Sequence, residues 1–110
     1  MLIKQSINFS KILEEVKNGK GQLVDVREKV EWQQNRFECA IHLPLSELSK
    51  GVGLDTLREL KQANKKIYLH CRSGVRVRQA QKVLARYGCT QVHPLPVSML
   101  QMLEKGFRLK

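Results

Sequence analysis

The sequence has no long uninterrupted apolar run. Among its 110 residues, no stretch approaches the roughly 18 apolar residues that a membrane-spanning helix requires. Residues 1–10 also lack the apolar stretch and the cleavage site of a secretory signal. These absences predict a cytoplasmic protein that does not engage a membrane.

Cysteine is scarce and irregularly placed. Cys39, Cys71 and Cys89 lie far apart, and no Cys-x-x-Cys pair occurs. An odd number of scattered thiols argues against both a disulfide scaffold and a zinc site, so we expect no metal and no other cofactor. Intracellular proteins usually bury such thiols as small hydrophobic side chains, so a chemical role for any of them needs local support.

Acidic and aromatic residues are also few. Asp and Glu number 10 against 20 Lys and Arg, which predicts a positive field that attracts anions. Nucleic-acid binders usually add aromatic stacking residues to a basic surface. With only one Trp, two Tyr and three Phe, the chain is not predicted to bind nucleic acid.

Short apolar stretches alternate between helical and strand spacing. Helices are predicted at residues 10–17, 28–34, 54–60, 77–87 and 98–104, and strands at residues 22–26, 39–43, 66–70 and 91–95. Ser10 is expected to cap the first helix, and Ser46 a turn after Pro44. Because parallel crossovers need an intervening element of about a dozen residues, this order predicts an α/β fold, with a small, mainly parallel sheet flanked by helices on both faces. Without a repeat or long linker, we expect one domain over residues 1–110.

Cys71 occupies a different context from the other two thiols. It directly follows the predicted strand at residues 66–70, and the next helix is expected to begin near Val77. In open α/β sheets, ligands bind beyond the carboxyl ends of the strands, where the first amides of the following helix are unpaired donors. The intervening loop consists of Arg72, Ser73, Gly74, Val75 and Arg76.

The loop composition favours a reactive thiol. Helix N-termini and nearby cations favour the thiolate, which is the nucleophilic form of cysteine. Arg72 and Arg76 supply positive charge, and Gly74 permits the backbone conformation that lets several amides point at one atom. An ordinary turn with a packed cysteine would also fit the spacing, but it would desolvate two arginines without a bound anion. We therefore interpret Cys71 as a nucleophile in an anion-binding loop.

The six residues from Cys71 to Arg76 resemble the active loop of single-domain rhodaneses. Two further segments carry the same likeness. Residues 23–28, Leu-Val-Asp-Val-Arg-Glu, followed by Glu31 and Trp32, resemble the opening signature of that family. Residues 40–45, Ala-Ile-His-Leu-Pro-Leu, resemble the segment that ends in a proline after its second strand. The resemblance extends from about residue 7 to residue 107.

This resemblance implies a rhodanese-like fold and a ping-pong sulfurtransferase. Such enzymes take sulfane sulfur from an anionic donor such as thiosulfate and pass it to cyanide or to a thiol, including a protein thiol. The likeness makes Cys71 the catalytic sulfur carrier, as a persulfide, and Arg72 and Arg76 the cations that bind the donor. Covalent catalysis with loop amides holding negative charge agrees with that cycle. The implied substrate-binding residues are Arg72, Ser73, Gly74, Val75 and Arg76.

Asp25 and Arg27 lie in the opening signature. We interpret them as structural support, a cap and an ion pair, rather than as catalytic groups. If the helix that follows begins early enough, Arg27 and Glu31 are also at helical i, i+4 spacing, where an exposed pair would contribute only about 0.3–0.5 kcal/mol.

The chain departs from the family pattern at the expected rim of the site. Asn35-Arg36 stands where the family commonly has Gly-His, and Cys39 replaces a glycine. After the last strand, Val97-Ser98 replaces a Gly-Gly pair and Met102 a tryptophan. We therefore expect the entrance to the site to differ from that of common rhodaneses.

Two other functions are compatible with this pattern. The domain could be a non-catalytic regulatory or docking module that keeps the rhodanese fold. It could also resemble a cysteine phosphatase or an arsenate reductase, but those enzymes place an arginine six residues after the cysteine, where this chain has Val77. The oligomeric state, the physiological donor and the acceptor are left open by the sequence.

Overall fold

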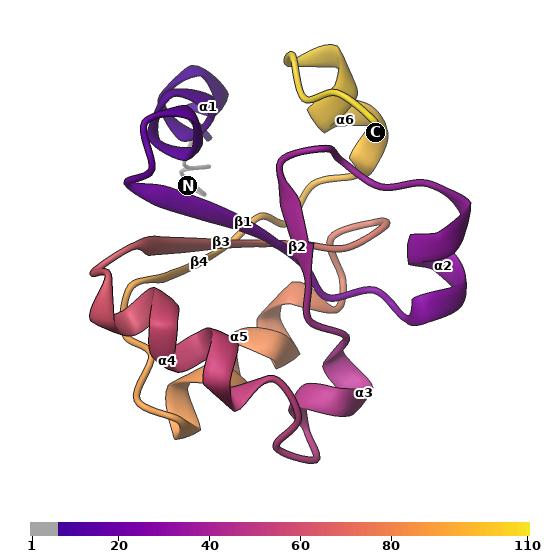
Figure 1. Ribbon diagram of the computed structural model, residues 1–110. Coiled ribbons are helices and arrows are strands. Elements are labelled where there is room, and N and C mark those ends of the chain that lie inside the picture. The colour runs from indigo at the N-terminus through magenta and orange to yellow at the C-terminus, as the bar shows by residue number, and fades with distance from the viewer. Residues whose placement is uncertain (1–6) are drawn as a thin grey trace, which may run out of the picture.

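A four-stranded parallel sheet organises the chain (Figure 1). The computed structural model describes residues 7–110, so the first six residues of the predicted domain lie outside the described part. The strand order is β2-β1-β3-β4, and every neighbouring pair is parallel. The strands are β1 (Gly21–Asp25), β2 (Ala40–His42), β3 (Lys66–His70) and β4 (Val92–Pro94). The prediction of an α/β fold with a parallel sheet is confirmed.

The two central strands are buried on both faces. Leu23, Val24 and Leu69 are fully inaccessible to solvent, as expected for inner strands of a parallel sheet covered on both sides. Residues of β1 and β3 pair in register from Gly21 opposite Lys66 to Asp25 opposite His70. The carboxyl ends of the central strands therefore lie side by side, which fixes where a site at that edge can form.

Helices cover the sheet on both faces (Figure 1). Two of them, α1 (Phe9–Lys17) and α6 (Met99–Glu104), contribute Ile12, Met99 and Met102 to one apolar cluster. On the opposite face a second cluster contains side chains from three helices, α3 (Leu45–Leu48), α4 (Leu54–Gln62) and α5 (Val77–Arg86). The remaining helix, α2 (Lys29–Gln34), follows β1 directly and contributes no fully buried residue.

Several helix starts differ from the sequence-based expectation by one or two residues. Asn8, not Ser10, caps α1, because its side-chain oxygen accepts a hydrogen bond from the Lys11 amide. Ser46 lies inside α3, which begins at Leu45 after Pro44, so it does not cap that turn. The first difference arises because more than one polar residue near the start of α1 can act as its cap. In α3 the N-cap is Pro44, and no side chain caps the helix. Along the described residues, no helix is both long and apolar enough to span a membrane.

Candidate active site

The Cys71 thiol lies at the carboxyl end of β3, beside that of β1. Cys71 is fully buried, and the Gly74 amide donates a hydrogen bond to its Sγ atom at 3.1 Å. The chain then turns over five residues, 72–76, and enters α5, whose first residue, Val77, is fully buried in the core. The sequence therefore predicted correctly the strand, loop and helix that position this sulfur.

Only glycine fits at position 74, because of both the backbone conformation and the close surroundings there. Its φ angle of +90° lies in the left-handed region, which glycine adopts without steric cost. A Cβ atom at this position would lie 2.6 Å from the carbonyl carbon of Pro96 and 2.7 Å from the Val97 amide nitrogen. The segment after β4 thus packs directly on the loop, and the Met99 amide donates to the Arg72 carbonyl at 3.1 Å.

The loop leaves most of its amides available. Within residues 7–110, the backbone N–H groups of Arg72, Ser73, Val75 and Arg76 donate to no protein atom that satisfies hydrogen-bond geometry. These donors precede a ten-residue helix, where the helix dipole adds partial positive charge. The arrangement can stabilise negative charge on an atom attached to Cys71 Sγ.

Arg76 is held by a carboxylate from a distant part of the chain. Its Nη1 and Nη2 atoms donate to Glu31 Oε1 at 2.6 Å and to Glu31 Oε2 at 2.9 Å. This pairing lowers the pKa of Glu31 to about 2. The pKa of Arg76 is raised, chiefly by its hydrogen bonds with Glu31 and also by the neighbouring Cys71 sulfur.

The expected pair between Arg27 and Glu31 was wrong. Helix α2 begins at Lys29, so Arg27 precedes it and the i, i+4 geometry does not arise. Glu31 instead serves two groups: it closes a capping box with Glu28 and binds Arg76. No strong signal of this is present in the sequence, because Glu28 is not among the residue types that usually occupy an N-cap, although it closes the box here.

Asp25 and Arg27 form a buried ion pair next to the loop. The guanidinium donates to both carboxylate oxygens, with Nη2 to Oδ2 at 2.8 Å, and both side chains are almost completely buried. The Arg27 amide also donates to Asp25 Oδ1 at 2.9 Å. The remaining guanidinium donors bind the side-chain and backbone oxygens of Asn35 at 3.0 and 2.7 Å. Asn35 thus links β1 to the end of α2.

The buried His70 side chain, at the end of β3, lies beside this ion pair. Its Nε2 atom is 3.5 Å from Asp25 Oδ2, yet among the described residues it has no partner with hydrogen-bond geometry. Burial lowers the pKa of His70, against the opposing effect of the Asp25 carboxylate, so the imidazole is neutral at physiological pH. We therefore read the contact as packing of a neutral ring rather than as a second ion pair.

A pocket of about 390 Å³ adjoins the loop. Arg72 and Ser73 line one part of it, and side chains from α2, α6 and the C-terminal residues line the rest. Arg72 and Ser73 are exposed, whereas Arg76 is half-buried against Glu31. Of the two arginines predicted to bind a donor, Arg72 is thus the one that faces this pocket.

The altered rim positions fall in different environments. Ser98 lines the pocket and caps α6 through a hydrogen bond from the Gln101 amide. Met102 is fully buried in the core, so it does not form part of the entrance. Arg36 lies over the Trp32 ring, 5.1 Å from its centroid. The residues that differ from the family pattern therefore change the entrance mainly at Asn35, at Ser98 and at the backbone of Val97.

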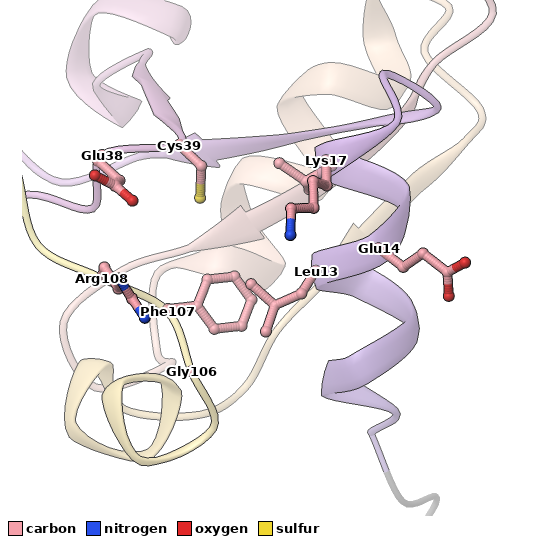
Figure 2. Close-up of a pocket in the computed structure, with 9 residues that line it drawn as sticks. Leu13, Glu14, Lys17, Glu38, Cys39, Gly106, Phe107 and Arg108 are labelled. Atoms are coloured by element: carbon pink, nitrogen blue, oxygen red, sulfur yellow. The ribbon is translucent and has the colours of Figure 1, made fainter.

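A larger pocket of about 710 Å³ lies elsewhere, between α1, the segment before β2 and the C-terminal residues (Figure 2). Cys39 faces it, but none of the described loop residues lines it. Burial raises the pKa of Cys39 and also that of Cys89, which keeps both thiols protonated at neutral pH. Neither sulfur is positioned as Cys71 is, and within residues 7–110 no group of three His, Cys, Asp or Glu side chains could hold a metal ion.

Comparisons with known proteins agree with the fold. The family model described as Rhodanese-like domain matches residues 8–105. The uncharacterized protein YqhL of Bacillus subtilis (strain 168) is 34% identical over 76 residues, which cover 69% of this chain and 56% of YqhL. This chain therefore spans little more than half the length of that relative.

Two solved structures share the fold over most of their length. Protein hp1203 from Helicobacter pylori 26695 is 32% identical with a TM-score of 0.69, covering 89% of this chain and 84% of that one. The single-domain sulfurtransferase RDL2 of Saccharomyces cerevisiae is 26% identical with a TM-score of 0.66, covering 89% and 87%. Since the family model matches residues 8–105, from α1 through the Cys71 loop to α6, the chain belongs to the rhodanese-like domain family.

Proposed function

We propose that this protein is a sulfurtransferase that carries sulfane sulfur on Cys71 as a persulfide. Family membership and the likeness to the sulfurtransferase RDL2 support this general activity. The observation on which the proposal depends is the Gly74 amide, which donates to the Cys71 sulfur at 3.1 Å in a loop with further free amides. A cytoplasmic location remains a prediction from the sequence.

The proposed cycle consists of two displacements at sulfur. The Cys71 thiolate attacks the sulfane sulfur of an anionic donor such as thiosulfate, the sulfur–sulfur bond of the donor breaks, and sulfite leaves with the electron pair. An acceptor, cyanide or a thiolate, then attacks the outer sulfur and releases the Cys71 thiolate. The loop amides stabilise negative charge on the outer sulfur, and covalent storage divides a difficult transfer into two easier steps.

Phosphatase chemistry is less well supported. Val77 stands where cysteine phosphatases have their phosphate-binding arginine, and its side chain is fully buried in the core. The guanidinium of the nearest arginine in the loop, Arg76, is already bound by both oxygens of Glu31. A phosphate dianion would therefore lack the bidentate cation that such a site supplies.

Intact mass spectrometry after incubation with thiosulfate tests the proposal. We expect a gain of one sulfur atom that cyanide removes, with release of thiocyanate. Cys71→Ala should abolish this gain, and Cys89→Ala, which removes another buried thiol, should retain it. If several donors produce no gain on the wild-type protein, the sulfurtransferase proposal is wrong and a non-catalytic module is favoured. Release of phosphate from an aryl phosphate would instead favour the phosphatase.

A further inference from the structure

Exposed leucines surround the pocket beside the Cys71 loop. Leu100, Leu103 and Leu109 line the same pocket as Arg72 and Ser73, and Leu100 is 65% exposed. We call Leu100, Leu103 and Leu109 the apolar rim. Contiguous exposed apolar side chains bordered by polar residues are typical of interaction sites.

Most charged side chains at this pocket are already paired with other groups of the protein. Arg27 is bound by Asp25 and by Asn35, and Glu31 is bound by Arg76. Among the described residues that line the pocket, Arg72 is left as the cation without a carboxylate partner. A small anion could bind the exposed guanidinium of Arg72 in this pocket, but it would make no contact with the leucines.

The occupant that fits this surface is apolar where it meets the rim and acidic around it. The chain carries a formal net charge of +10, which opposes the approach of a second copy and attracts an acidic partner. A small thiol could not cover the side chains of α6 and of Leu109, the second-last residue, together. These observations favour a protein over a small molecule.

We propose that the apolar rim docks an acidic protein partner that presents a cysteine between apolar residues to the Cys71 persulfide. This inference rests on the proposed function, because it names the acceptor of the same site. The partner's thiolate attacks the outer sulfur, a new sulfur–sulfur bond forms on the partner, and the bond to Cys71 Sγ breaks. The electron pair stays with Cys71 as a thiolate, so no external oxidant or reductant is required.

A binding experiment tests the docking surface independently of sulfur loading. The probe is a fluorescein-labelled synthetic peptide in which a serine, standing for the cysteine, lies between leucines and is flanked by aspartates. A matched peptide keeps the aspartates and replaces the leucines by serine. We expect Leu100→Ser/Leu103→Ser to raise the Kd of the leucine peptide about tenfold or more, because two apolar contacts are lost.

Control variants keep this test interpretable. Val52→Ser alters an apolar side chain that is 51% exposed between α3 and α4, on the opposite face of the sheet, and should leave the Kd unchanged. Leu100→Ser alone, at a side chain with little core packing, should raise the Kd in the same direction as the double variant. Equal binding of the two peptides, or a Kd that the rim variants do not change, would overturn the docking inference.

Transfer kinetics separate this inference from the proposed function. With thiosulfate-loaded protein, the rim variants should slow sulfur transfer to the cysteine form of the leucine peptide about tenfold. The same variants should leave discharge to cyanide unchanged, because cyanide does not contact the rim. Normal discharge to cyanide with rim-independent transfer to the peptide refutes the docking surface alone. A protein that binds the peptide through the rim but never gains sulfur refutes the proposed function alone.

Discussion

The Arg76 guanidinium donates to both carboxylate oxygens of Glu31, a residue 45 positions earlier in the chain. The last cation of the Cys71 loop is therefore paired before any substrate arrives. The pair links α2 to the start of α5 and holds the Arg76 guanidinium beside the sulfur. The Glu31 carboxylate also cancels much of the positive charge of that guanidinium. Donor attraction is left mainly to Arg72, which is exposed at the neighbouring pocket.

Glu31→Gln should lower the KM for thiosulfate about threefold, because it removes a negative charge close to a dianionic donor. Steady-state kinetics at low ionic strength measure the effect. Glu14→Gln, which makes the same charge change at an exposed position of α1, serves as the control. A KM that falls equally in both variants would show that only the net charge matters.

Arg72→Ala should raise the KM for thiosulfate about fivefold, and the difference should shrink at high salt as screening weakens the attraction. Arg72→Lys should retain most of the affinity if charge alone binds the donor. The comparison variant is Arg86→Ala at the far end of α5, where an exposed arginine is removed away from the loop. An unchanged KM in Arg72→Ala would exclude Arg72 from donor binding.

The Glu31 carboxyl group should titrate far below its usual range. Its pKa is lowered from 4.5 to about 2, so the pair stabilises the folded state fully above pH 4.5 and loses that contribution as the pH falls towards 2. Carbon-detected NMR titration of the Glu31 carboxyl measures this directly. Arg76→Met should return the pKa towards its ordinary value. A Glu31 that titrates normally in the wild type would contradict the ion pair.

Gly74→Ala should disrupt the loop. Left-handed backbone costs a non-glycine residue roughly 1–2 kcal/mol, and here the new methyl group also meets the backbone of Pro96 and Val97. We expect sulfur loading to slow about a hundredfold as the amide leaves the sulfur. Gly19→Ala carries similar strain at φ +77° with nothing within 4 Å, so it should lower stability without slowing loading. Equal loading rates in the two variants would refute this role for Gly74.

Asp25→Ala should lower the free energy of unfolding by about 3–5 kcal/mol, because it leaves the Arg27 guanidinium buried without its anion. Urea denaturation measures the change. Asp55→Ala breaks an exposed pair with Arg58 and should cost less than about 1 kcal/mol. Similar losses for the two variants would mean that burial does not set the contribution of the inner pair.

Local patterns were sufficient to predict much of this protein. The strand at residues 66–70, the cysteine that follows it and the helix that begins at Val77 were predicted at the observed positions. Alternating helices and short strands also predicted the parallel sheet, because parallel neighbours require crossovers. These features depend on residues that are close together in the sequence, so periodicity and loop composition are enough to predict them.

Prediction was less accurate where several residues could play one role. Asn8 rather than Ser10 caps α1, and Glu31 pairs with Arg76 rather than with Arg27. More than one polar residue near the start of α1 can act as its cap. The partner of Glu31 lies 45 residues away along the chain, where local spacing does not indicate it.

The sequence by itself determined the α/β class and the strand, loop and helix that present Cys71, because these follow from short-range spacing. Only the tertiary structure decided that Glu31 neutralises Arg76, that Pro96 closes on Gly74, and that Leu100 and Leu109 share a pocket with Arg72. Those contacts join segments that are distant along the chain. Their partners are set by strand order and helix docking, which bring the ends of β1, β3 and β4 to the same edge of the sheet.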